Sequence, residues 1–170
     1  MIGHIRAKLR QFMRAEDIVA RVAETYASAV EYGDTCELVA GDAHGKFRTS
    51  FVRSADRLFF DGVLSVKGRT HRFTLDPMLK IGMAVAELAG VTLGVAHTIP
   101  RLLWPRAIGG RSILDAPATL LRRTNDRIEL VLTGSVPRRI VIDARTWMIV
   151  LHEQDVMDRA TIVATYKPGF

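Results

Sequence analysis

The sequence predicts an α+β fold, in which one strongly curved antiparallel sheet carries helices on one side. The first observation is that nine short runs of residues have the two-residue period of strands, with short polar turns between most of them. The second is a change to helical signals at the N-terminus and again halfway along the chain. The 170 residues contain no linker, repeat or low-complexity tract, so residues 1–170 are expected to form a single domain.

An amphipathic helix is predicted within the first thirty residues. Ile18, Val22, Tyr26 and Val30 recur at every fourth position, and charged or polar residues lie between them. Gly33 follows and is expected to end this helical run. The helix therefore has one apolar face that must pack against the rest of the domain.

Residues 1–15 are predicted to be a basic helical extension. Ile5, Leu9 and Phe12 form an apolar stripe, and arginine and lysine flank it. Two interpretations stay open for this segment: a helix that lies on a membrane surface, or a first helical turn that packs on its own domain.

Strands are predicted on both sides of the middle of the chain. In the second of them Phe47, Thr49 and Phe51 share one face while Lys46 and Arg48 point to the other, as in a half-buried antiparallel strand. The first four runs are TCELVAG, KFRTSFVR, DRLFFDGVLSV and RTHRFTL, and the last five are TLLRRT, RIELVLTG, RRIVIDA, TWMIVLHEQD and ATIVATYKP.

A helical insertion is predicted between the fourth and fifth strands. Residues 76–90 begin with a capping aspartate and a proline, and they are apolar on nearly all sides. Such a helix must be covered by protein or by a ligand. In the next stretch, GVTLGVAHTIPRLLWP, two glycines interrupt the helix, and Pro100 and Pro105 bracket a short turn. Residues 106–117 are expected to be a flexible loop.

The charge of the chain favours anionic partners, but its pattern does not select nucleic acid. The formal net charge is +6, and most of the basic residues are arginine. They are spread along the chain, so a general arginine bias explains the excess as well as a binding surface does. Aromatic residues make up 7% and do not interleave with the arginines, and no glycine-rich phosphate loop is present. No nucleic-acid partner is expected.

No constellation of catalytic or metal-ligating residues is recognisable, so the protein is not expected to be an enzyme or to hold a metal or cofactor. The single cysteine, Cys36, lies in a predicted strand and is expected to be buried and inert. No serine elbow or zinc spacing occurs. His97, alone among apolar residues, is the remaining candidate for chemistry, and a satisfied polar contact is its plainer interpretation. The five histidines are scattered: His4, His44, His71, His97 and His152.

The apolar surplus is the informative feature, because large and adaptable side chains suit a pocket for alkyl chains. The alternative is that these residues form an ordinary core. The predicted ligand-binding residues come from the strands, from the inserted helix and from the segment after it: Phe47, Phe51, Leu58, Phe60, Met78, Met83, Leu88, His97, Leu130 and Leu132.

Three motifs together resemble the LolA-like superfamily of lipoprotein carriers and lipoprotein-sorting proteins. They are AETYASAVEYGDTCELV, KFRTSFVRSADRLFF and AGVTLGVAHTIPRLLWP, the last of which is similar to a segment of one predicted periplasmic branch. The resemblance covers the chain beyond about residue 16. It implies an antiparallel half-barrel whose concave face is closed by helices around an apolar cavity, with the helix from Pro77 and the stretch GVAHTIPRLL (residues 94–103) as a lid.

The resemblance also implies a function and a compartment. The leading hypothesis is non-enzymatic binding of an acyl chain, lipid or lipoprotein in the cavity, as carrier or sensor. The alternatives are a protein-interaction module in envelope-stress signalling and an enzyme that uses His97. The resemblance implies a periplasmic location, whereas no signal peptide is recognisable. Both the periplasm and the cytoplasm therefore stay open as locations.

Overall fold

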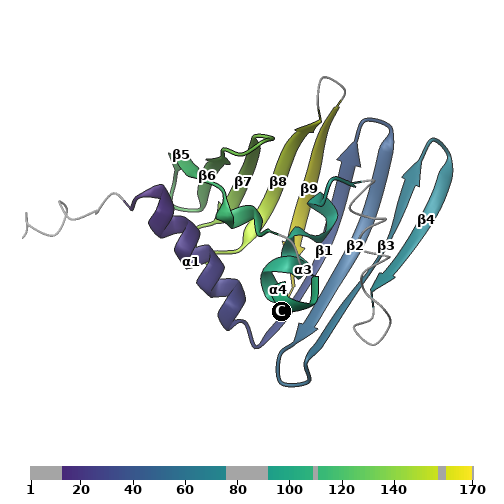
Figure 1. Cartoon of the computed structure of the whole chain (residues 1–170), viewed down its shortest axis with the longest axis horizontal. Coiled ribbons are helices and arrows are strands. Elements are labelled where there is room, and N and C mark those ends of the chain that lie inside the picture. Colours follow the sequence, from purple (N-terminus) through teal and green to yellow (C-terminus); the bar gives the residue numbers. More distant parts are fainter. Residues whose placement is uncertain (1–12, 76–91, 109–110, 157–159, 170) are drawn as a thin grey trace, which may run out of the picture.

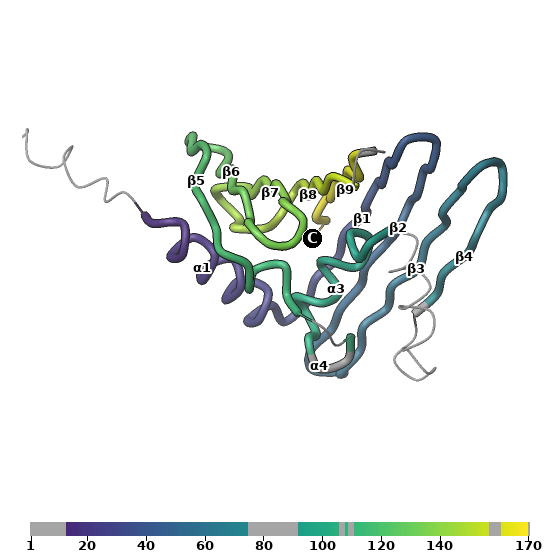
Figure 2. The backbone as a smooth tube through the Cα atoms, turned by 45° about the horizontal axis from the view of Figure 1, so that its top comes forward, coloured from purple at the N-terminus to yellow at the C-terminus, as the bar shows by residue number. Residues whose placement is uncertain are grey.

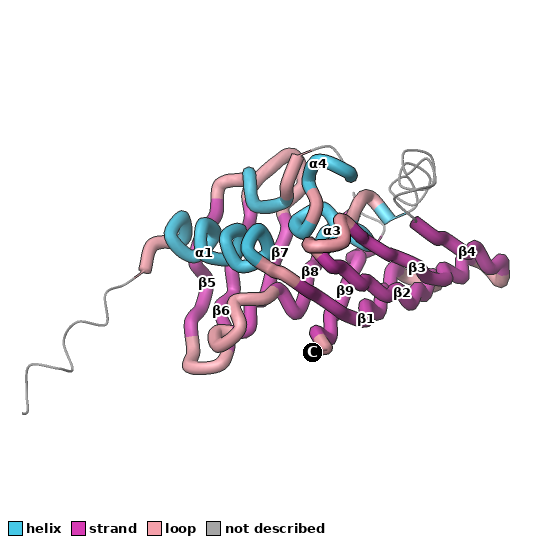
Figure 3. Tube along the Cα trace, turned by 90° about the horizontal axis from the view of Figure 1, so that it is seen from below, coloured by secondary structure: helices cyan, strands magenta, loops and turns pink. Residues whose placement is uncertain are grey.

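The computed structural model describes residues 13–75, 92–108, 111–156 and 160–169. In this part of the chain the protein is one open antiparallel sheet of nine strands with helices on one face (Figure 1, Figure 3). This confirms the predicted α+β class and the curved half-barrel architecture. The inserted helix predicted for residues 76–90 and most of the basic extension, residues 1–12, lie outside the described residues.

Helix α1 (Ala15–Ser28) packs on the sheet through one stripe of residues. Asp17 accepts a hydrogen bond from the backbone N–H of Arg14 at 3.2 Å, which closes the first turn. Ile18, Val22 and Tyr26 are fully buried, as the spacing predicts. Val30 is 64% exposed, so the prediction that it belongs to the apolar stripe of the helix was wrong.

The helix ends earlier than its hydrophobic spacing suggests because strand pairing begins there. The backbone of Ala29 is already extended, and Glu31 pairs with Val52 of the neighbouring strand. Gly33 does not terminate the helix but lies inside the first strand. A Cβ atom added to Gly33 would lie 3.2 Å from the backbone carbonyl oxygen of Gly169, so the two backbone segments approach closely here.

The nine strands follow one another as hairpins in two groups. Their bounds are β1 (Glu31–Ala40), β2 (Ala43–Val52), β3 (Arg57–Val66), β4 (Arg69–Leu75), β5 (Ala118–Arg123), β6 (Arg127–Leu132), β7 (Arg138–Asp143), β8 (Ile149–Val156) and β9 (Ala160–Pro168). The order across the sheet is β4-β3-β2-β1-β9-β8-β7-β6-β5, and every pair is antiparallel. Strand β9 therefore lies between β1 and β8 and joins the two groups (Figure 2).

Four short helices are described between β4 and β5: η1 (Val95–His97), α3 (Thr98–Leu103), α4 (Pro105–Ile108) and η2 (Ile113–Asp115). The predicted turn between two prolines was wrong, since α3 begins at Thr98 and includes Pro100. A proline is accommodated in a first helical turn because the N–H groups there have no partner within the helix. The segment predicted as a loop, residues 106–117, overlaps α4 and contains η2, where the hydroxyl of Ser112 accepts from the N–H of Leu114 at 3.1 Å.

The inner face of the sheet forms the core. In β2 burial alternates strictly, and Phe47, Thr49 and Phe51 are buried as predicted. The ring of Phe47 stacks on Phe60 of the adjacent strand, with 5.4 Å between ring centroids and 4° between planes. A Cβ added to Gly62, the cross-strand partner of Phe47, would lie only 2.2 Å from that ring. The glycine therefore gives the ring room to lie close to the sheet.

Among the described helices, none is both long and apolar enough to cross a membrane.

Candidate functional site

The structure brings most of the predicted ligand-binding residues together on the inner face of the sheet. Phe47 and Phe51 come from β2, Leu58 and Phe60 from β3, and Leu130 and Leu132 from β6. Each of them is at most 3% exposed, and all belong to one continuous apolar cluster. Met78, Met83 and Leu88 lie outside the described residues. The clustered side chains are packed against protein atoms, as residues of a core are.

The remaining predicted residue, His97, lies beside a polar pocket that the sequence did not predict. The pocket has a volume of about 50 Å³ and lies between α3, the residues before η1 and the start of η2 on one side and β7 and β8 on the other. We call it the arginine pocket. Its lining residues are Leu93, Gly94, Thr98, Arg101, Arg111, Ile113, Arg138, His152 and Gln154.

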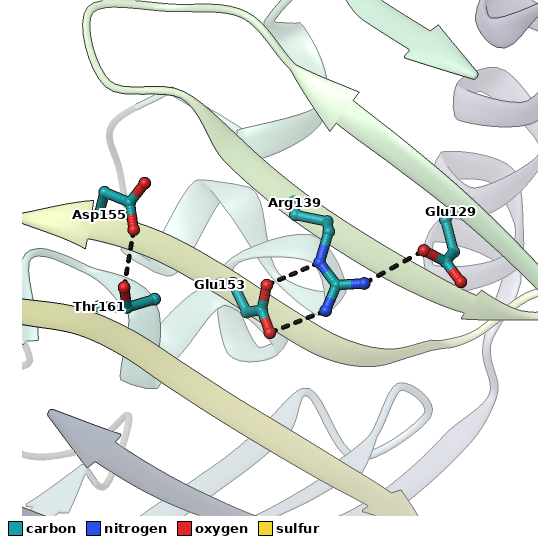
Figure 4. Close-up of polar contacts among 5 residues, drawn as sticks. All are labelled: Glu129, Arg139, Glu153, Asp155 and Thr161. Atoms are coloured by element: carbon teal, nitrogen blue, oxygen red, sulfur yellow. Dashed lines mark hydrogen bonds and ion pairs between the residues drawn. The ribbon is translucent and has the colours of Figure 1, made fainter. Parts of the chain in front are cut away.

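Strands β7 and β8 place Arg138, His152 and Gln154 at the pocket. Arg138 pairs with Gln154 in the strand register, and its Nε donates to the amide oxygen of Gln154 at 2.8 Å. Its neighbour Arg139 points to the other face, where it donates to Glu153 at 2.6 Å and to Glu129 at 3.1 Å (Figure 4). Successive residues of a strand point to opposite faces, so only Arg138 of this pair reaches the pocket.

The opposite wall of the pocket is held together by Arg101 of α3. One terminal amino group of its guanidinium donates to the backbone carbonyl of Arg111 at 3.1 Å, and the other contacts Nε2 of His97 at 3.2 Å. Because a guanidinium can only donate, Nε2 of His97 accepts this bond and the proton of the neutral ring is on Nδ1. Thr98, at the start of α3, places its hydroxyl 3.0 Å from Nδ1 of His152.

Three polar atoms of this region are buried without a hydrogen-bond partner: Nδ1 of His97, Nε of Arg101 and Nε2 of His152. Both histidines are at most 2% exposed. Burial lowers the pKa of His97 to about 4, with the charge of Arg101 adding to the effect. Burial likewise lowers the pKa of His152 to about 3, with the charge of Arg138 adding. Both rings are therefore neutral at pH 7.

The pocket is electrostatically one-sided. Within the described ranges the ion pairs join acidic side chains to Arg14, Arg48, Arg139 and Lys167, and none involves Arg101, Arg111 or Arg138. Burial lowers the pKa of Arg101, and repulsion by Arg138 lowers it further. Arginine nevertheless stays charged at neutral pH. The pocket therefore holds positive charge and hydrogen-bond donors that no carboxylate of the described residues neutralises.

A second buried polar group lies on the inner face of β1 but is satisfied by its neighbours. Asp34, 5% exposed, accepts from the hydroxyl of Tyr32 at 2.8 Å and from the N–H of Thr49 at 3.2 Å. Burial raises the pKa of this carboxyl group. Cys36, two residues further along the same face, is 2% exposed, and burial raises the pKa of its thiol, as predicted for an inert cysteine. No group of three or more metal-ligating residues occurs in the described part of the chain.

Sequence reasoning missed Arg101, Arg111 and Arg138 because arginine is common throughout the chain. One signal was present in β8. His152 and Gln154 occupy positions of the strand that face inward, where an alternating pattern otherwise places apolar residues. Polar residues at inward positions indicate either a buried network or a site.

No protein-family model matches the sequence, and no curated protein matches it. The chain is similar in structure to MucB, solved as a crystal structure in complex with MucA(peri). The TM-score is 0.51 at 10% sequence identity, and the match covers 92% of this chain. It covers 56% of the MucB chain, so this chain spans little more than half of that length. At this level of identity the likeness shows a shared fold, the curved antiparallel half-barrel, and MucB is a solved protein with that fold.

Proposed function

We propose that the protein is a non-enzymatic binding protein that takes up an apolar ligand on the inner face of its half-barrel, as a carrier or a sensor. The ligand classes are an acyl chain, a lipid or an acylated protein. The observation that supports this is the single apolar cluster that spans the sheet from Phe47 and Phe60 in β2 and β3 to Leu130 and Leu132 in β6.

The energetics of such binding follow from the packing. Each methylene group removed from water contributes about 0.8 kcal/mol, so a long alkyl chain can repay the cost of moving protein side chains. The Phe47 and Phe60 rings are stacked, and both are buried. A ligand therefore has to repack the aromatic side chains of this face, and affinity is expected to rise with chain length.

Fluorescent fatty acids with chains of 8 to 16 carbons test the proposal, together with native mass spectrometry of the purified protein. Phe60→Leu is the test variant because this side chain is buried on the inner face. Phe59→Leu is the matched control, since the adjacent residue of β3 faces the other side, where Arg48 lies over its ring at 5.9 Å. We expect affinity to increase with chain length and to change in Phe60→Leu alone. Equal affinity for all chain lengths, or no binding, would contradict the proposal.

A protein-interaction module is the second candidate, and the structural likeness to MucB supports it, since that protein was solved in complex with MucA(peri). The open sheet offers an edge at β5, where Leu121 is 56% exposed. Cross-linking in extracts of the native cell should then capture one defined partner. Loss of that partner in Leu121→Ser, but not in the control Thr119→Ser on the same strand, is the expected outcome, and equal capture by both variants speaks against an interface at β5.

A further inference from the structure

We propose that the arginine pocket binds a small oxyanion, either a phosphate or a carboxylate group. The pocket is formed by segments that are far apart in the sequence, with Arg101 in α3, Arg111 before η2 and Arg138 in β7. This inference is independent of the proposed apolar ligand, because it needs only the geometry and charge of the pocket.

The pocket concentrates positive charge. Three arginine residues line one pocket, and no acidic side chain of the described residues pairs with any of them. Their mutual repulsion is unfavourable in the absence of an anion, as the effect of Arg138 on Arg101 reflects. An oxyanion is the partner that guanidinium groups bind best, since they offer it parallel N–H donors.

The pocket region also has unused hydrogen-bonding capacity. Nε of Arg101 and Nε2 of His152 are buried and have no partner, which is uncommon in folded proteins. Arg138 bonds to Gln154 through Nε, and no described group accepts from its terminal amino groups. The guanidinium of Arg111 likewise forms no hydrogen bond to a described group. The contact between Arg101 and Arg111 involves only the backbone carbonyl of Arg111. The pocket thus presents several donors to one small volume.

The size of the pocket suits a small anion. A single water needs about 10–15 Å³ of such a cavity. The volume of about 50 Å³ therefore admits a group of about four heavy atoms, which suits a phosphate or a carboxylate but not a hydrocarbon chain. Burial also favours selectivity for anions, because charged hydrogen bonds strengthen as water is excluded.

Titration with sodium phosphate, at an ionic strength held constant with sodium chloride, tests the site. Arg111→Gln is the test variant because the Arg111 side chain is exposed and has no internal hydrogen bond to lose, so the variant is expected to fold. Arg123→Gln, which removes an exposed arginine of β5, is the matched control. We expect saturable binding by calorimetry, with the Kd raised about tenfold in Arg111→Gln and unchanged in Arg123→Gln.

A second readout follows the side-chain NMR signals of His97 and His152, which are expected to shift with phosphate in the wild type. The absence of saturable binding to the wild type, or equal weakening in the two variants, would overturn the proposal.

Octyl phosphate and sodium acetate extend the test to the source of the anion. Both are expected to displace phosphate from the wild-type protein, and failure of both to compete would overturn the assignment of this pocket to oxyanions in general. The result is separate from that for the apolar ligand. Phosphate binding that depends on Arg111, without any binding of fluorescent fatty acids, would support this site while removing the proposed function.

Discussion

The hydroxyl of Thr98 lies 3.0 Å from Nδ1 of His152, and this contact links the first turn of α3 to the inner face of β8. Both residues are nearly inaccessible to solvent, at 5% and 2% exposure. The contact fixes one ring nitrogen of His152, while the other has no partner. It therefore also sets the position of a side chain that lines the arginine pocket.

Replacing Thr98 with valine is expected to reduce the free energy of unfolding by about 1–3 kcal/mol, because the hydrogen bond is lost and both ring nitrogens of His152 are then buried without partners. Urea denaturation measures this change. Thr98→Ser keeps the hydroxyl and is expected to lose less stability than Thr98→Val. Should the valine variant be as stable as the serine variant, the hydrogen bond contributes nothing.

The close approach of Phe47 to Gly62 predicts a second effect on stability. A methyl group at residue 62 meets the ring at 2.2 Å and the carbonyl oxygen of Lys46 at 2.6 Å, so Gly62→Ala must displace either the ring or the strand. We expect a loss of about 1–3 kcal/mol in the free energy of unfolding. At Gly134 an added Cβ has no neighbour closer than 4.0 Å, so Gly134→Ala should be nearly neutral. Equal midpoints for the two variants in urea would show that the ring moves without cost.

The two buried histidines predict that the protein loses stability in mild acid. Their pKa values in the folded protein are about 4 for His97 and about 3 for His152, below the ordinary value of 6.5. Between these values the unfolded chain binds protons that the folded protein does not, so the free energy of unfolding falls as the pH falls from 6.5 towards 4. Each histidine contributes a loss of about 2–3 kcal/mol between pH 6.5 and 4.5.

Burial raises the pKa of Asp34, so this carboxyl group changes the free energy of unfolding in the opposite direction. Comparison of the wild type with His152→Gln isolates the contribution of His152, since both proteins contain Asp34. Denaturation at pH 7, 5.5 and 4.5 should show a steeper decline for the wild type than for the variant. Parallel declines would mean that His152 titrates normally in the folded protein.

The ion pairs of Arg139 on the outer face should matter much less than the buried contacts. The side chains of Arg139 and Glu153 are 35% and 26% exposed, so solvent screens their attraction. We expect Glu153→Gln to cost about 1 kcal/mol or less, and to cost less still in 1 M sodium chloride. Thermal unfolding at low and high salt measures both values. A cost that does not change with salt would indicate that lost packing, not charge, is responsible.

The sheet was predictable from the sequence because its two faces differ. One face of β2 is solvated and the other packs on the core, so the alternation of Phe47, Thr49 and Phe51 with polar residues records the burial directly. The nine strands and the helix stripe through Ile18, Val22 and Tyr26 were predicted for the same reason.

The boundaries of helices and the arginine pocket were not predictable in this way. Val30 continues the helical spacing, yet pairing of Glu31 with Val52 in β2 ends the helix first. A local pattern contains no information about such a long-range contact. The pocket depends on the register that sets Arg138 opposite Gln154 and on the packing of α3 over β8, and neither can be derived from spacing along one segment.

The position of β9 between β1 and β8 has a consequence for how the protein is synthesised. Apart from β1 and β9, neighbouring strands of the described sheet are consecutive in the chain, so each half can form hairpin by hairpin as it leaves the ribosome. The halves become one sheet only when Ala160–Pro168 has emerged, because this strand carries the hydrogen bonds to both of them. Until then β1 exposes an unpaired edge, and a nascent chain stalled before residue 160 is expected to be prone to aggregation through that edge.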